Sequence, residues 1–139
     1  DHVLETLSRH LPESVFALLP LLAVSRMFNL DILGNLVQAF SVSVSYQEQK
    51  KLLEISFVEQ CLSFPPFYKL HDLLIAPLLR RAEHDDARRC LNILLAYAQR
   101  AILGGQLEVA QTVFAAVVNA IHATNLEDTE LNERAIDLA

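Results

Sequence analysis

Glycine and proline, the residues that build tight turns, are scarce in this chain. Its 139 residues include three glycines, five prolines and no tryptophan. A loop that wraps backbone amides around a phosphate needs several glycines, and neither GxGxxG nor GxxxxGK occurs. An all-β chain needs many tight turns as well. The shortages therefore argue against a nucleotide-binding loop and favour helices over sheets.

Catalytic and metal-binding motifs are missing too. HExxH and GxSxG do not occur, so the sequence shows neither a metalloprotease helix nor a nucleophile elbow. The nearest set of zinc-ligand types is Cys61, His71, His84 and Cys90. Their spacings match no structural zinc site, and both cysteines fall in predicted helices, where thiols pack in cores. We predict that the protein is not an enzyme and holds neither a metal nor a cofactor.

Positive charge is in the minority, with 11 Lys and Arg against 17 Asp and Glu. Nucleic-acid-binding domains usually carry a basic face and a high pI, so the domain as a whole is not expected to bind nucleic acid. Six of the eleven basic residues nevertheless fall within 69–100. They are Lys69 and a candidate basic patch of Arg80, Arg81, Arg88, Arg89 and Arg100. Two interpretations stay open: a patch for RNA or an acidic partner, or a solvated outer face balanced by neighbouring carboxylates.

The two cysteines form no CxxC pair, which fits buried thiols in a reducing compartment. No signal-peptide pattern is present, and the longest charge-free run, 109–126, is interrupted by polar residues. We predict an intracellular protein, cytoplasmic or nuclear, without a membrane span. Because the chain starts without methionine and stops inside a periodic segment, we expect it to be a domain of a larger protein.

Hydrophobic residues make up 53% of the chain and charged residues 20%. Leucine and alanine at helical spacing predict an all-α domain of six to eight helices. We expect antiparallel hairpins that form a short α-solenoid or an irregular bundle, with a linker at 41–45 and a capping box at Ser45 and Glu48. The predicted helices are 1–10, 12–24, 29–40, 45–63, 67–81, 85–103, 106–122 and 128–139. The prolines at 65 and 66 break the single domain 1–139 into sub-bundles of about 1–63 and 67–139.

The hairpin 85–122 is the most strongly predicted unit. Asp85 is the expected cap of its first helix, and Gly104 and Gly105 supply the left-handed turn that ends it. The first helix carries arginines on one side, whereas the second has only a thin polar stripe. We therefore expect the first helix to face outward and the second to lie at the centre of the bundle or in an interface.

Two apolar segments are candidates for a shared surface. Residues 15–24 leave almost no polar face, although Pro20 is expected to kink or split the helix. Together with the second hairpin helix, they give this candidate partner interface: Val15, Phe16, Leu18, Leu19, Leu22, Val113, Phe114, Val117 and Val118. A monomer of this size has more apolar side chain than it can easily bury. We predict a protein–protein interaction or scaffolding module that associates with a protein partner or forms a homodimer.

The hairpin resembles a tetratricopeptide-type unit. Gly105 lies at the turn, and Ala110 and Phe114 lie in the second helix. Ala98 occupies a position of the first helix where such units have a small residue. Residues 83–91 faintly resemble the second-helix pattern a second time. The two similar stretches lie closer together than the usual repeat period of about 34 residues. His122 stands where such units usually have a proline after the second helix. Residues 64–74 are similar to the helical tails of WD-repeat ribosome-assembly scaffolds. That likeness implies an alternative function, an RNA-linked scaffold that uses the arginine face.

Overall fold

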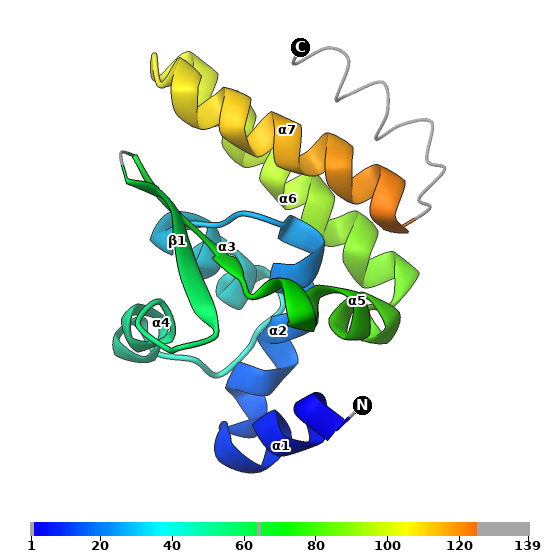
Figure 1. The fold of residues 1–139 in the computed structure, drawn as a ribbon. Coiled ribbons are helices and arrows are strands. Elements are labelled where there is room, and N and C mark those ends of the chain that lie inside the picture. The colour runs from blue at the N-terminus through cyan, green and yellow to red at the C-terminus, as the bar shows by residue number, and fades with distance from the viewer. Residues whose placement is uncertain (1, 64, 125–139) are drawn as a thin grey trace.

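Helices form most of the described chain. The computed structural model describes residues 2–63 and 65–124, and these contain seven helices and one strand pair (Figure 1). The helices are α1 (His2–His10), α2 (Glu13–Ser25), α3 (Leu30–Ala39), α4 (Tyr46–Leu52), α5 (Asp72–Arg81), α6 (His84–Leu103) and α7 (Leu107–Thr124), and the strands are β1 (Val58–Ser63) and β2 (Pro66–Leu70). The predicted helical class is confirmed. The helix predicted at 128–139 lies outside the described residues.

Side-chain caps start several helices. The Asn29 side chain accepts a hydrogen bond from the Ile32 amide at 2.8 Å, which fixes the start of α3. The predicted capping box is present, because Ser45 and Glu48 exchange bonds of 3.2 and 3.0 Å at the start of α4. Asp85 is not the cap of α6, which begins one residue earlier. It lies in the first turn, where its carboxylate faces the positive end of the helix dipole.

Helix α2 is the central element. It packs against α1, α3, α5, α6, α7 and β2, and eight of its thirteen residues are buried. No polar stripe is needed on a helix that is covered on nearly every side. The helix continues through Pro20 without a break, so the predicted split does not occur.

Helices α6 and α7 lie side by side and are joined by a short turn at Gly104 and Gly105 (Figure 1). Gly105 has a φ of 77°, as the predicted left-handed turn requires. Helix α6 packs against more elements than α7 does, although its arginines are exposed as expected. Helix α6 packs on α2, α3 and α7, whereas α7 packs on α6 and α2 and exposes Ala115, Asn119 and Ala123. Alanine counts as apolar in a helix pattern but leaves little surface to bury.

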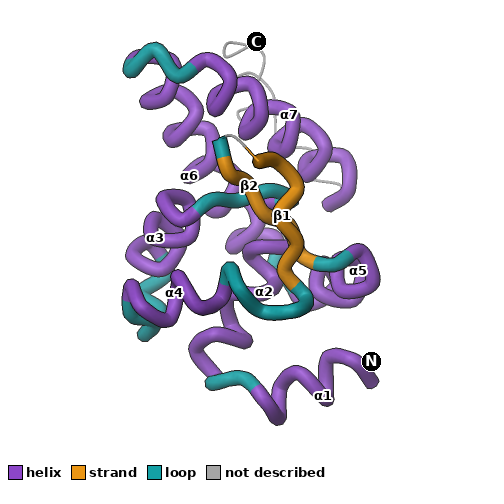
Figure 2. The backbone as a smooth tube through the Cα atoms, turned by 60° about the vertical axis from the view of Figure 1, so that its left-hand side comes forward, coloured by secondary structure: helices purple, strands orange, loops and turns teal. Residues whose placement is uncertain are grey.

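An antiparallel hairpin replaces parts of two predicted helices. Helix α4 ends at Leu52, and residues 58–63 and 66–70 are strands rather than helix (Figure 2). Val58 pairs with Leu70, and the ladder is bulged at Cys61. On its other edge β2 bridges to Phe28, whose amide and carbonyl bond Tyr68 at 2.9 and 2.8 Å. These partners lie far along the chain, so the local apolar spacing that suggested helix could not reveal them.

The predicted break at 64–66 falls where β1 ends and β2 begins. Buried residues from both sides of it, among them Leu22, Leu36, Leu78 and Leu94, belong to one hydrophobic cluster. Residues 42–45 form the predicted linker, with Val44 buried against the same cluster.

Candidate functional site

The α2 residues predicted as a partner interface belong to the core of the chain itself. Val15 is 6% exposed, and Leu18, Leu19 and Leu22 are fully buried. Phe16 is partly buried, with the Arg81 guanidinium 5.5 Å from its ring centroid. These side chains therefore pack within the core of the chain itself.

The α7 residues of the predicted interface are also largely covered. Val113 and Val117 are buried, while Phe114 and Val118 are partly buried. The side of α7 that remains open carries small and polar residues instead. Composition therefore identified an apolar helix correctly but did not identify which side of it stays accessible.

The five candidate arginines are spread over several surfaces. Arg89 donates to the Ala39 carbonyl and lies 4.5 Å from the Phe40 ring centroid, and Arg88 faces Asp85 at 3.6 Å. Arg100 lies eleven residues beyond Arg89, about 16 Å along α6. The remaining two, Arg80 and Arg81, line separate hollows.

Some of the five candidate arginines lie beside carboxylates. The hollow beside Arg81 is also lined by Glu83 and Asp86. Most of the five guanidinium groups therefore contact an aromatic ring or a carboxylate of the same chain. This is the arrangement expected of an outer face with balanced charge.

An apolar end that the sequence reasoning missed lies at the α6–α7 turn. Leu103 is 83% exposed, Leu107 59% and Ile102 36%. We call Ile102, Leu103 and Leu107 the apolar tip. The signal was available in the sequence, because Leu103 and Leu107 directly flank the predicted glycine turn.

The cysteines and histidines considered for zinc do not come together. Among the described residues, no three His, Cys, Asp or Glu side chains could hold a metal ion. Cys61 lies 3.6 Å from the Met27 sulfur. Cys90 is fully buried, 3.3 Å from the Ser25 hydroxyl, and burial raises the pKa of its thiol to about 12. A thiol that stays protonated is a poor nucleophile and a poor ligand, so Cys90 is a packing residue.

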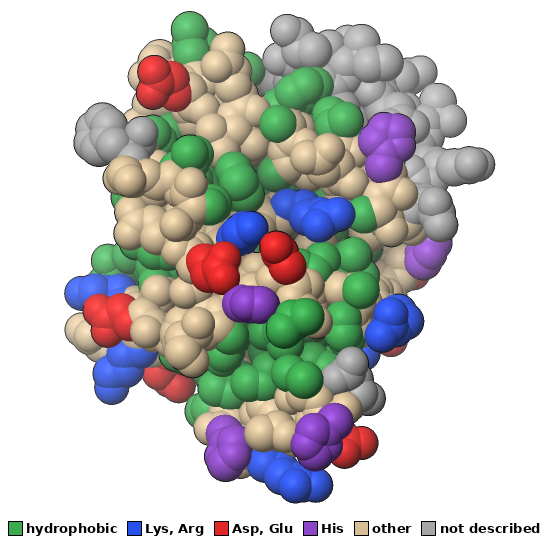
Figure 3. All heavy atoms as spheres, in the orientation of Figure 1, with side chains coloured by type: hydrophobic (Ala, Val, Ile, Leu, Met, Phe, Trp, Pro, Cys, Tyr) green, Lys and Arg blue, Asp and Glu red, His purple; other side chains and the backbone are tan. Residues whose placement is uncertain are grey.

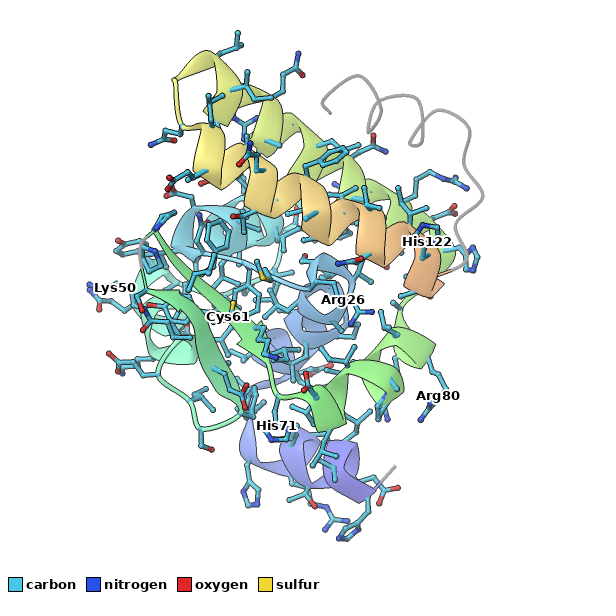
Figure 4. The ribbon with its side chains drawn as sticks, turned by 45° about the horizontal axis from the view of Figure 1, so that its top comes forward. Arg26, Lys50, Cys61, His71, Arg80 and His122 are labelled. Atoms are coloured by element: carbon cyan, nitrogen blue, oxygen red, sulfur yellow. The ribbon has the colours of Figure 1, made fainter. Side chains whose placement is uncertain are left out.

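A groove of about 740 Å³ lies between the end of α2 and one side of α7. Figure 4 shows Arg26 at the end of α2, beside the helix that carries His122. The lining residues are Arg26, Met27, Thr112, Ala115, Ala116, Asn119, His122 and Ala123, and none of them is acidic. The six from α7 follow a spacing of three and four, so they form one strip of the helix. We call this hollow the Arg26 groove.

Arg26 combines two unfavourable features. Its φ of 67° and ψ of −59°, with a 2.7 Å bond from the Met27 amide to the Ser25 carbonyl, make it the centre of a strained γ-turn. Its Nε is buried and has no hydrogen-bond partner among the described residues. An unpaired buried donor costs about 1–3 kcal/mol. Neither feature helps folding, which makes Arg26 a candidate functional residue.

Comparison with known proteins adds no relative. No family model matches the chain, and neither a curated protein nor a solved structure is significantly similar to it. Within the described residues, α7 has the length and apolar composition of a membrane-crossing helix, but core helices pass the same test. It is therefore no clear membrane span. Function has to be inferred from the geometry.

Proposed function

We propose that this protein is a protein–protein interaction module that contacts its partner through the apolar tip. The observation that carries the proposal is the exposure of Leu103 and Leu107 beside the Gly104–Gly105 turn. Polar residues would end α6 and begin α7 equally well, since neither leucine supports the core. Large apolar groups gathered on a surface typically mark contact sites.

The partner that fits this tip is a protein with an apolar recess. The residues around the tip are mainly uncharged, with Gln99 and Gln106 exposed, and Arg100 and Glu108 offset each other. An overall charge of −6 disfavours close approach to a nucleic-acid backbone or to an acidic protein surface. The tip is thus an end at which another protein can approach without strong charge repulsion.

We also infer that the helices form an irregular bundle rather than a solenoid. The contacts of α2 with elements throughout the chain support this, because the repeats of a solenoid contact only their neighbours. Burial of Ala98 and Ala110 supports a likeness of α6 and α7 to one tetratricopeptide-type unit. The free thiols of Cys61 and Cys90 support an intracellular setting.

Site-specific photocrosslinking tests the proposal. Benzoylphenylalanine is placed at Leu103 of the full chain, and at Leu73 as a control because that leucine is 74% exposed on α5. In native extract, a discrete adduct is expected from position 103 and not from position 73. An adduct of twice the chain mass would identify the partner as a second copy.

The partner identified by crosslinking is then purified, and the affinity of the natural chain for it is measured by calorimetry. The double variant Leu103→Gln, Leu107→Gln is expected to bind at least about 10-fold more weakly, since each buried leucine contributes about 1.5–3 kcal/mol. Leu73→Gln should bind like the natural chain. Equal adducts at both positions, or unchanged affinity of the double variant, would refute the proposal.

A further inference from the structure

A second binding site is indicated by the Arg26 groove, which shares no residue with the apolar tip. Arg26 lines a groove whose other lining residues are Met27 and six residues of α7. Figure 3 shows basic and acidic side chains next to one another near the centre of one face of the molecule. Within residues 2–63 and 65–124, no Asp or Glu lines the groove to neutralise Arg26. In a chain with an excess of carboxylates, a cation without a counter-ion in a groove points to an anion from outside.

We propose that the Arg26 groove binds a small organic oxyanion, a carboxylate or a phosphate ester. The Nε and Nη groups of arginine form a planar fork that matches two oxygens of either group. The buried and unpaired Nε is the half of this fork that lies deepest. A ligand oxygen reaches this buried atom only after the side chain turns toward the groove, and it then supplies the hydrogen bond that no described residue provides.

The α7 strip supplies the remaining contacts. Asn119 and His122 are exposed on the groove side and can donate hydrogen bonds to further oxygens. The Thr112 hydroxyl donates to the Glu108 carbonyl at 2.9 Å, so it is not a donor to the oxyanion. Ala115, Ala116 and Ala123 leave room above the helix and give an apolar wall for a carbon skeleton.

The size of the groove fits a free small molecule. Its volume of about 740 Å³ lies within the range of small-molecule pockets, about 300–1,000 Å³. Small-molecule pockets are mostly apolar with a few converging polar groups, and this groove has that composition. The γ-turn holds the Arg26 backbone in one conformation at the groove edge, with its amide bonded to the Leu22 carbonyl at 3.2 Å.

The probes are phenyl phosphate and benzoate, which carry the two oxyanions on the same apolar ring. Each is titrated into the full chain at fixed salt, followed by calorimetry and by NMR of the arginine Nε–H, asparagine amide and histidine ring signals. Saturable binding that moves the signals of Arg26, Asn119 and His122 is expected. Binding of phenyl phosphate alone indicates a phosphate-ester ligand, and binding of benzoate alone indicates a carboxylate.

Variants separate this site from general charge attraction. Arg26→Gln should weaken binding about 10- to 100-fold, and Arg26→Lys should weaken it less because it keeps the charge but loses the fork. Arg9→Gln removes the same charge from an exposed position on α1 and should leave binding unchanged. Ala115→Leu fills the groove at an exposed position and should weaken binding even if Arg26→Gln fails to fold.

Three results would overturn the inference. The first is no saturable binding of either probe at millimolar concentration. The second is equal binding by Arg26→Gln or Ala115→Leu. The third is a set of NMR changes confined to residues outside the groove. Because the tip residues are not involved, failure here leaves the crosslinking result standing, and the reverse is also true.

Discussion

The connection that follows α2 and the connection that follows α6 each need one residue with positive φ, but they use different residues there. Gly105 has a φ of 77° after α6, and Arg26 has a φ of 67° after α2. Glycine adopts such angles without steric penalty, whereas a residue with a Cβ does not. Arginine at this position indicates that its side chain is required for something other than chain reversal.

The last turns of the two helices also differ in burial. The last turn of α2 is fully buried at Leu22, Val24 and Ser25, whereas the last turn of α6 exposes Ile102 and Leu103. The buried end of α2 therefore contributes to stability and also holds an Arg26 Nε that has no partner among the described residues. The exposed end of α6 carries apolar surface that stability does not need. Neither Arg26 after α2 nor the exposed leucines at the α6–α7 turn are needed for folding. The first motivates the proposed oxyanion site, and the second motivates the proposed protein contact.

The largest expected effect contrasts the two helix ends directly. Leu22→Ala removes a fully buried side chain and should lower the free energy of unfolding by about 3 kcal/mol. Leu103→Ala should change it by less than about 0.5 kcal/mol, because that side chain is 83% exposed. Urea unfolding followed by circular dichroism measures both. Similar losses in the two variants would contradict the contrast.

A pH effect tests how tightly the end of α2 is buried. Burial raises the pKa of Cys90 to about 12 from a usual value near 9, so above pH 9 the unfolded chain loses this proton while the folded chain keeps it. Stability is therefore lost as pH rises, at about 1.4 kcal/mol per unit within that window.

The measurement is urea unfolding of the natural chain and of Cys90→Ala at pH 8 and pH 10. Between these values, the natural chain should lose about 1.4 kcal/mol more than the variant, because the variant lacks the shifted thiol. Other groups titrate equally in both proteins and cancel in the difference. Identical losses would show that Cys90 and the Ser25 end of α2 are accessible to water.

The smallest effect concerns the α6–α7 turn. Gly105→Ala places a Cβ at positive φ and should destabilise the fold by about 1 kcal/mol, although nothing lies within 4 Å of the new atom. Gly104 is the matched control, because its φ of −84° suits alanine and its new Cβ would make only ordinary contacts. Thermal unfolding of the two variants compares them. A loss at Gly104 as large as that at Gly105 would rule out the φ explanation.

Sequence patterns predicted the helices that depend on local signals. The capping box at Ser45 and the glycine turn after α6 are where the sequence patterns predicted them. The helix prediction for residues 58–63 was wrong because a strand forms where it finds a pairing partner. Here the partner is β2, which in turn bridges to Phe28. Local periodicity contains no information about such a partner.

The functional positions were harder to predict than the fold. The α2 leucines looked like an interface because nothing polar flanks them, yet a central helix has the same pattern. Arg26 gave one weak signal, a single cation at the end of an otherwise apolar run. Its importance depends on a backbone angle and on an unpaired atom, and neither can be read from residue type. The tip leucines could have been found by noting that they flank the glycines outside the buried face.

The most direct test of the central claim, that Arg26 is retained for binding and not for folding, is a paired measurement on Arg26→Gly. Glycine relieves the γ-turn strain and removes the unpaired Nε, so the free energy of unfolding should stay equal or rise by up to about 1 kcal/mol. Binding of phenyl phosphate and benzoate should be lost in the same sample. A variant that loses more than about 1 kcal/mol of stability while binding both probes like the natural chain would contradict the claim.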